Sequence, residues 1–209
     1  MQIETAYGPA AVELDGPARA KFLLVLTHGA GGGVDSADLL AARDAGLSAG
    51  GTVARVLQPY RVRGASAPGS PQRQDAAWLE IIAALRDRRP RRPLVQGGRS
   101  NGARVACRTA TAAGATAVLA LAFPLHPPGR PDRSRADELR AAGVDVLVIN
   151  GDRDPFGIPD PADAARVVVL PGQTHALSGA ARLIEREVSA WLGAVLAGGR
   201  AVSTRARRA

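Results

Sequence analysis

Apolar and polar positions along the chain form short blocks that predict alternating strands and helices. Continuous apolar runs, such as residues 22–26 and 117–121, are typical of strands buried on both faces of a parallel sheet. Between such runs, apolar residues recur at helical spacing, most clearly in the segment 72–89. The alternation predicts an α/β fold, in which a mostly parallel central sheet is flanked by helices.

The expected elements follow from these blocks and from the turn residues between them. The predicted strands are a hairpin within residues 2–14 and the segments 22–26, 53–57, 94–95, 117–121, 144–149 and 166–170. The predicted helices are 35–45, which Gly46 would end, 72–89, which Pro90 would stop, 103–113, 135–142, and a last one from about residue 178. Residues 58–71 are expected to be a loop. We expect one domain over residues 1–197 and a flexible basic tail over 198–209.

Composition narrows the class of protein. The 209 residues carry a net charge of +8, and Lys21 is the only lysine, so the basicity is almost wholly arginine. Only 3% of residues are aromatic, which disfavours a stacking surface for nucleic acid. Cys107 is the only cysteine, which excludes an internal disulfide and multi-cysteine metal sites. There is no apolar run of membrane-spanning length and no signal-peptide pattern, so we expect a soluble, cytoplasmic protein without a membrane partner.

A possible nucleophile lies in the segment 94–107, L-V-Q-G-G-R-S-N-G-A-R-V-A-C. It contains G-x-S-x-G between a predicted strand and a predicted helix, the context of a nucleophile elbow with Ser100 at its apex. Such spacing also arises by chance in a chain with 24 glycines, so the alternative is a plain glycine-rich turn. The partners expected of a nucleophile favour the first interpretation.

Those partners are a histidine base and an acid that orients it. His175 follows the last predicted strand and is the one histidine that comes after the candidate acids, although a plain surface-loop histidine is the alternative. Asp154 is favoured as the acid over Asp152, which could be a turn residue or a helix cap. Nucleophile, acid and histidine then follow the chain order of α/β hydrolases.

An oxyanion hole is expected from two backbone N–H groups. One belongs to Asn101, and the other to Ala30 or Gly31 in the glycine-rich loop after the first central strand. His28 in this loop is expected to bond the loop backbone rather than to act in catalysis. A phosphate cradle is disfavoured, because neither the dinucleotide-binding nor the P-loop pattern is complete.

Four segments carry a resemblance to a known family: T-H-G-A-G-G, G-G-R-S-N-G-A-R-V-A, F-P-L-H-P-P-G and G-D-R-D-P-F-G. They resemble small α/β hydrolases near the dienelactone hydrolases, and more narrowly bacterial relatives of testis-expressed protein 30 and of the third subunit of the NSL complex. The resemblance spans roughly residues 20–195 and implies an α/β-hydrolase fold with a Ser100–His175–Asp154 site, no metal and no organic cofactor. Dienelactone hydrolases proper use cysteine, so their particular chemistry is not implied.

The substrate site is expected to be open. Only about a dozen proline-rich residues join the strand near residue 122 to the helix near residue 135, which leaves no room for a cap domain. Phe123, His126 and Phe156 are expected to line the pocket together with His28, although Phe156 could equally be a core residue. An open site favours a small or extended acyl ester over long-chain lipids.

The leading hypothesis is therefore a serine hydrolase of the carboxylesterase kind, acting on a small-molecule substrate. A hydrolase-fold interaction module without catalysis is the rival, motivated by the regulatory relatives and by the arginine-rich segments 86–92 and 200–208. Acyl transfer to an acceptor other than water would use the same residues. The oligomeric state and the acyl and leaving groups are not assigned by the sequence.

Overall fold

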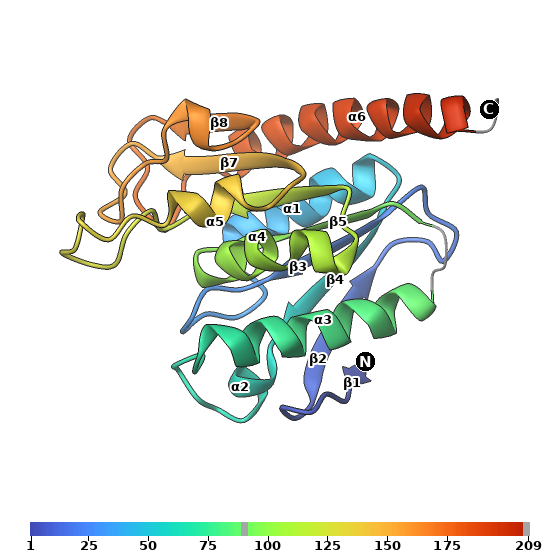
Figure 1. Ribbon diagram of the computed structural model, residues 1–209, viewed down its shortest axis with the longest axis horizontal. Coiled ribbons are helices and arrows are strands. Elements are labelled where there is room, and N and C mark those ends of the chain that lie inside the picture. The colour runs from blue at the N-terminus through green and yellow to red at the C-terminus, as the bar shows by residue number, and fades with distance from the viewer. Residues whose placement is uncertain (89–91, 207–209) are drawn as a thin grey trace.

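The computed structural model describes the backbone of residues 1–88 and 92–206, with side chains up to residue 198. One eight-stranded sheet crosses the molecule in the order β1-β2-β4-β3-β5-β6-β7-β8 (Figure 1). β1 and β2 pair antiparallel, as do β2 and β4, and all other neighbours are parallel. The strands are β1 (Gln2–Ile3), β2 (Ala10–Asp15), β3 (Leu23–Thr27), β4 (Thr52–Leu57), β5 (Leu94–Arg99), β6 (Ala117–Leu121), β7 (Asp145–Gly151) and β8 (Arg166–Leu170).

Helices cover both faces of the sheet. They are α1 (Ala37–Ser48), α2 (Pro59–Val62), α3 (Pro71–Asp87), α4 (Asn101–Ala113), α5 (Ala136–Arg140) and α6 (Ala181–Ala206), with a 3₁₀ turn at Pro161–Asp163. α1 and α6 pack together on one face, and α3 packs on α4 on the other. Within β3, Leu23 and Val25 join the core under α3 and α4, whereas Leu24 and Leu26 join the core under α1 and α6. This period of two is why the strands are apolar throughout.

The structure confirms the predicted α/β fold and the edge hairpin at the N-terminus. β6 and α5 are joined by residues 122–135, and no cap domain is inserted in this described segment. The sheet therefore presents the carboxyl ends of its parallel strands to an open edge, where ligand sites of such folds form.

Two of the predicted elements were wrong, the end of the helix at Gly46 and the loop 58–71. α1 does not end at Gly46 but continues to Ser48, because Gly46 is buried where a Cβ would lie 2.8 Å from Leu24 and 2.9 Å from Val53. This glycine is therefore a packing residue and not a helix stop. Within the expected loop 58–71, Pro59 begins the short helix α2, where its fixed φ suits the first helical turn.

The C-terminal segment 198–209 is predicted to be a flexible basic tail. The structure describes α6 up to Ala206, through a segment that contains no proline, and the flexibility of this tail stays a prediction. Residues 207–209 lie outside the described residues. Pro90, predicted to stop the helix before it, also lies outside them, and α3 ends at Asp87.

Candidate active site

Ser100 lies at the sharp turn between β5 and α4, near the centre of the sheet. Its backbone has φ 54° and ψ −115°, a conformation that non-glycine residues rarely adopt. The turn is close-packed, because a Cβ on Gly98 would lie 2.5 Å from the Thr27 carbonyl oxygen, and one on Gly102 2.7 Å from the same oxygen. Glycine is thus required on both sides of Ser100, and the turn has the geometry of the predicted elbow.

The structure brings the three predicted side chains into one hydrogen-bonded chain. His175 Nε2 lies 2.9 Å from Ser100 Oγ, and His175 Nδ1 lies 2.8 Å from Asp154 Oδ2. Because the carboxylate can only accept, Nδ1–H donates to it, and Nε2 is left to accept the proton of the Ser100 hydroxyl. Asp152, the alternative acid, is exposed and makes no such contact.

The carboxylate of Asp154 is held in place by groups of its own loop and of β7. Its side chain is fully buried, and Oδ1 accepts a hydrogen bond from the Phe156 N–H at 2.9 Å. Asn150 lies 3.5 Å away through Nδ2 and also bonds both backbone groups of Phe123, at 2.8 and 2.9 Å. Asn150 therefore ties the loop after β6 to the loop that carries Asp154. No sequence pattern indicated this role, because an asparagine at the end of a strand is common.

Arg99, the residue before the serine, also contacts the histidine loop. Its Nη2 donates to the His175 carbonyl oxygen at 2.8 Å. Its Nε lies 2.9 Å from Oδ2 of Asp38 in α1, whose side chain is fully buried, although the two groups are not aligned for a hydrogen bond. Arg99 thus connects helix α1 to the backbone of the candidate base. Sequence reasoning treated this position as the variable residue of G-x-S-x-G and missed it.

The glycine-rich loop after β3 is anchored by His28. The His28 ring is fully buried, its Nε2 accepts the Gln58 N–H at 3.0 Å, and its Nδ1–H therefore donates to the Gly29 carbonyl at 2.7 Å. That carbonyl shares a peptide group with the Ala30 N–H, which must point the opposite way. Burial lowers the pKa of His28, which keeps the ring neutral and in this tautomer.

Two further side chains hold the candidate oxyanion donors. The Tyr60 hydroxyl donates to the Ala30 carbonyl at 2.8 Å, which fixes the peptide that carries the Gly31 N–H. The Asn101 side chain donates through Nδ2 to Gln74 Oε1 at 2.6 Å, so the start of α4 is tied to α3. Burial raises the pKa of Tyr60 to about 12, and the phenol stays protonated as this donor requires. Neither Tyr60 nor Gln74 was singled out from the sequence.

The predicted pocket residues divide into two pairs. His28 and Phe123 were expected to line the pocket, but both are fully buried, because each anchors a loop to the core. Phe156 and His126 are partly exposed. The Phe156 ring lies against His175, with centroids 4.4 Å apart and planes at 57°. The Phe156 ring therefore borders the candidate base. His126, in the loop after β6, packs beside Gly157, which directly follows Phe156 in the loop after β7.

Within the described residues, no group of three or more histidine, cysteine or acidic side chains is placed to hold a metal ion. Among the same residues, no helix has the length and apolar character needed to cross a membrane. Cys107 is buried in the core under α4, and burial raises the pKa of its thiol, so it does not offer a second nucleophile.

A parallel sheet with a serine elbow, a histidine after the last strand and an acid after the strand before it defines the α/β-hydrolase class. The chain belongs to this family: the model of the alpha/beta hydrolase domain matches residues 20–179. None of the curated proteins compared with the chain matches it by sequence.

Solved structures of low sequence identity share the fold. Est1E from Butyrivibrio proteoclasticus, solved with bound ferulic acid, superposes with a TM-score of 0.77 at 16% identity, covering 94% of this chain and 99% of its own. An alpha-beta serine hydrolase homologue from Coxiella burnetii gives 0.76 at 15% identity, with coverages of 92% and 96%. A dienelactone hydrolase from Anabaena variabilis gives 0.72 at 17% identity, with coverages of 91% and 94%.

Proposed function

We propose that this protein is a serine hydrolase of the carboxylesterase kind, with Ser100 as nucleophile, His175 as base and Asp154 as the acid that orients it. The observation that carries the proposal is the continuous hydrogen-bonded chain from Ser100 Oγ through both ring nitrogens of His175 to the buried carboxylate of Asp154. A serine hydroxyl becomes a nucleophile only when such a base is poised to take its proton.

The reaction would proceed in two halves. In the first, Ser100 Oγ bonds to the ester carbonyl carbon while His175 Nε2 takes the hydroxyl proton, and the carbonyl oxygen becomes an oxyanion. The C–O bond to the leaving group then breaks, and His175 returns the proton to the departing alkoxide oxygen. In the second half, water attacks the acyl-serine with His175 again as the base, which releases the acid and restores Ser100.

The oxyanion would be held by the backbone N–H of Asn101 and by that of Ala30, with Gly31 as the alternative. Asn101 is the first residue of α4, so its N–H points out of the helix N-terminus, where the dipole favours negative charge. The bonds from His28 to the Gly29 carbonyl and from Tyr60 to the Ala30 carbonyl fix the neighbouring peptides. Donors fixed in advance do not have to reorganise as the charge develops.

The rival function, a hydrolase fold without catalysis, has no comparable support. This rival rests on the resemblance of the four motifs to testis-expressed protein 30 and the NSL subunit. We keep that resemblance itself as a proposal. A module without catalysis has no use for a strained Ser100 backbone, which costs about 1–3 kcal/mol. Acyl transfer uses the same first half-reaction and differs only in the acceptor.

Labelling with a fluorophosphonate, which reacts with activated serines, tests the proposal. Wild type should be labelled, Ser100→Ala should not, and His175→Ala should be labelled far more slowly because the base is missing. Arg182→Gln changes an exposed side chain on α6, away from the site, and as the control it should react like wild type. Absence of labelling in folded wild type, or full labelling of Ser100→Ala, would contradict the proposal.

A further inference from the structure

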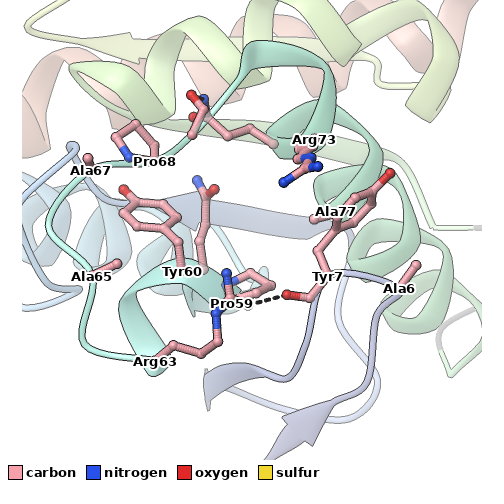
Figure 2. Close-up of a pocket in the computed structure, with 13 residues that line it drawn as sticks. Ala6, Tyr7, Pro59, Tyr60, Arg63, Ala65, Ala67, Pro68, Arg73 and Ala77 are labelled. Carbon is pink, nitrogen blue, oxygen red and sulfur yellow. Dashed lines mark hydrogen bonds between the residues drawn. The ribbon is translucent and has the colours of Figure 1, made fainter.

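A pocket of about 520 Å³ lies beside the candidate oxyanion loop, and Figure 2 shows its lining. It is formed by the turn between β1 and β2, by α2 with the loop that follows it, and by the first turns of α3. Tyr60 and Tyr7 lie on opposite sides of the hollow, and Arg73 extends its guanidinium toward it from α3 (Figure 2). The volume falls within the range of small-molecule sites.

The pocket is connected to the candidate oxyanion donors by two of its lining residues. Gln74 accepts the bond from Asn101, which directly follows Ser100, and Tyr60 holds the Ala30 carbonyl. A group bound in this pocket therefore contacts the same side chains that position the two proposed donors. The pocket therefore lies next to the residues that hold the proposed oxyanion donors, and it shares Tyr60 and Gln74 with them.

The sheet order decides which part of an ester would enter the pocket. His175 and Asp154 follow β8 and β7, on one side of the strand that carries Ser100, whereas the pocket follows β4 and the β1–β2 turn on the other side. The leaving group must lie by His175, which donates a proton to it. The acyl group then extends in the opposite direction, across β3 toward β4 and the pocket.

The lining is positively charged. Arg63 and Arg73 line the pocket, whereas none of the lining residues is acidic. Arg63 already donates to the Tyr7 carbonyl, whereas Arg73, which is exposed, forms no ion pair within the part of the chain that the structure describes. The acidic residue Glu80 bonds the N–H of the lining residue Ala6 at 2.8 Å, but Glu80 is not itself part of the lining. Because the phenol of Tyr60 stays protonated, it adds no negative charge.

We propose that this pocket binds an acyl chain whose far end carries a carboxylate, and that Arg73 pairs with that carboxylate. The natural substrates would then be half-esters of dicarboxylic acids. β4 is two strands from β5, so an acyl chain that reaches the pocket has to extend past β3. Chains of adipate or suberate length are therefore expected to fit better than succinate. The inference rests on the proposed function and adds the class of acyl group.

Matched esters test the charge preference. Mono-para-nitrophenyl adipate and para-nitrophenyl hexanoate have the same leaving group and the same chain length. The acyl chain ends in a carboxylate in the first ester and in a methyl group in the second. Wild type should prefer the adipate half-ester by about fivefold in kcat/KM, the upper range for an ion pair with an exposed arginine. A preference for the neutral ester would overturn the inference.

Variants of Arg73 assign the preference to this pocket. Arg73→Gln should raise KM for the adipate half-ester about fivefold and leave kcat and hexanoate turnover unchanged, because the contact is remote from the reacting atoms. Arg73→Lys should restore part of the preference. Arg182→Gln removes an exposed charge on α6 and should change neither ester. Equal loss on both esters in Arg73→Gln would overturn the assignment.

Calorimetric titration of Ser100→Ala with monomethyl adipate separates this inference from the proposed function. Binding that weakens about fivefold in Ser100→Ala/Arg73→Gln supports the pocket even if no ester is turned over, in which case only the hydrolase proposal fails. If the protein is labelled by the fluorophosphonate and turns over esters but shows no preference for a terminal carboxylate, the hydrolase proposal stands. The proposal of a carboxylate-binding pocket is then overturned.

Discussion

The contact between Arg99 and the histidine loop leads to a prediction in which stability and activity can be separated. Arg99→Met keeps the length of the side chain but removes the bond to the His175 carbonyl and leaves the Asp38 carboxylate buried without a cation. The first loss affects the position of the candidate base, and the second affects the fold. A second substitution can correct one loss without correcting the other.

The expected magnitudes follow from these two contacts. A hydrogen bond from a charged donor contributes about 1.5–3 kcal/mol. If that bond serves to place His175, its loss lowers kcat/KM by about 10- to 100-fold, since about 1.4 kcal/mol corresponds to tenfold. Breaking a buried pair costs about 3–5 kcal/mol, and we expect the lower end because the Arg99 side chain is 19% exposed.

Asp38→Asn in the Arg99→Met background removes the unpaired charge and keeps an oxygen that can accept the Leu39 N–H. The double variant should therefore regain most of the free energy of unfolding, measured by urea denaturation, while ester turnover stays low. The rate of fluorophosphonate labelling reports the same loss independently of substrate binding. Recovery of turnover together with stability would refute the reasoning, because it would show that Arg99 acts only through the fold.

Two other perturbations are predicted from packing and from burial. Gly98→Ala should lower the free energy of unfolding by about 1–3 kcal/mol, because the new Cβ would meet the Thr27 carbonyl. Gly193→Ala, in open space on α6, should raise the free energy of unfolding by up to about 1 kcal/mol. Urea denaturation that ranks the two variants in the opposite order would contradict this. Burial lowers the pKa of His28 below its ordinary value of 6.5. Between pH 6.5 and the folded pKa, the unfolded chain therefore binds a proton at His28 and the folded protein does not. The free energy of unfolding falls as the pH drops through this range. His28→Gln should flatten that acid-side slope in pH-dependent unfolding, and parallel curves for variant and wild type would contradict it.

The sequence by itself determined the order of the elements and the chemistry-bearing positions. Strands buried on both faces must be apolar throughout, so β3, β6 and most of β7 were visible as continuous runs. The G-x-S-x-G turn was readable because only glycine fits at Gly98 and Gly102, where backbone atoms come within Cβ distance. Chain order then singled out His175 and Asp154, whose side chains the structure brings together with Ser100.

Only the tertiary structure decided the supporting contacts, because they join residues far apart along the chain. Arg99 reaches His175 and Asp38, Asn150 reaches Phe123, and neither pairing leaves a local pattern. The same reason explains why His28 and Phe123 were wrongly placed in the pocket, since their burial depends on the layers packed over them. The arginine-lined pocket likewise exists only where the β1–β2 turn, α2 and α3 meet, a meeting that the sheet order creates and no single segment encodes.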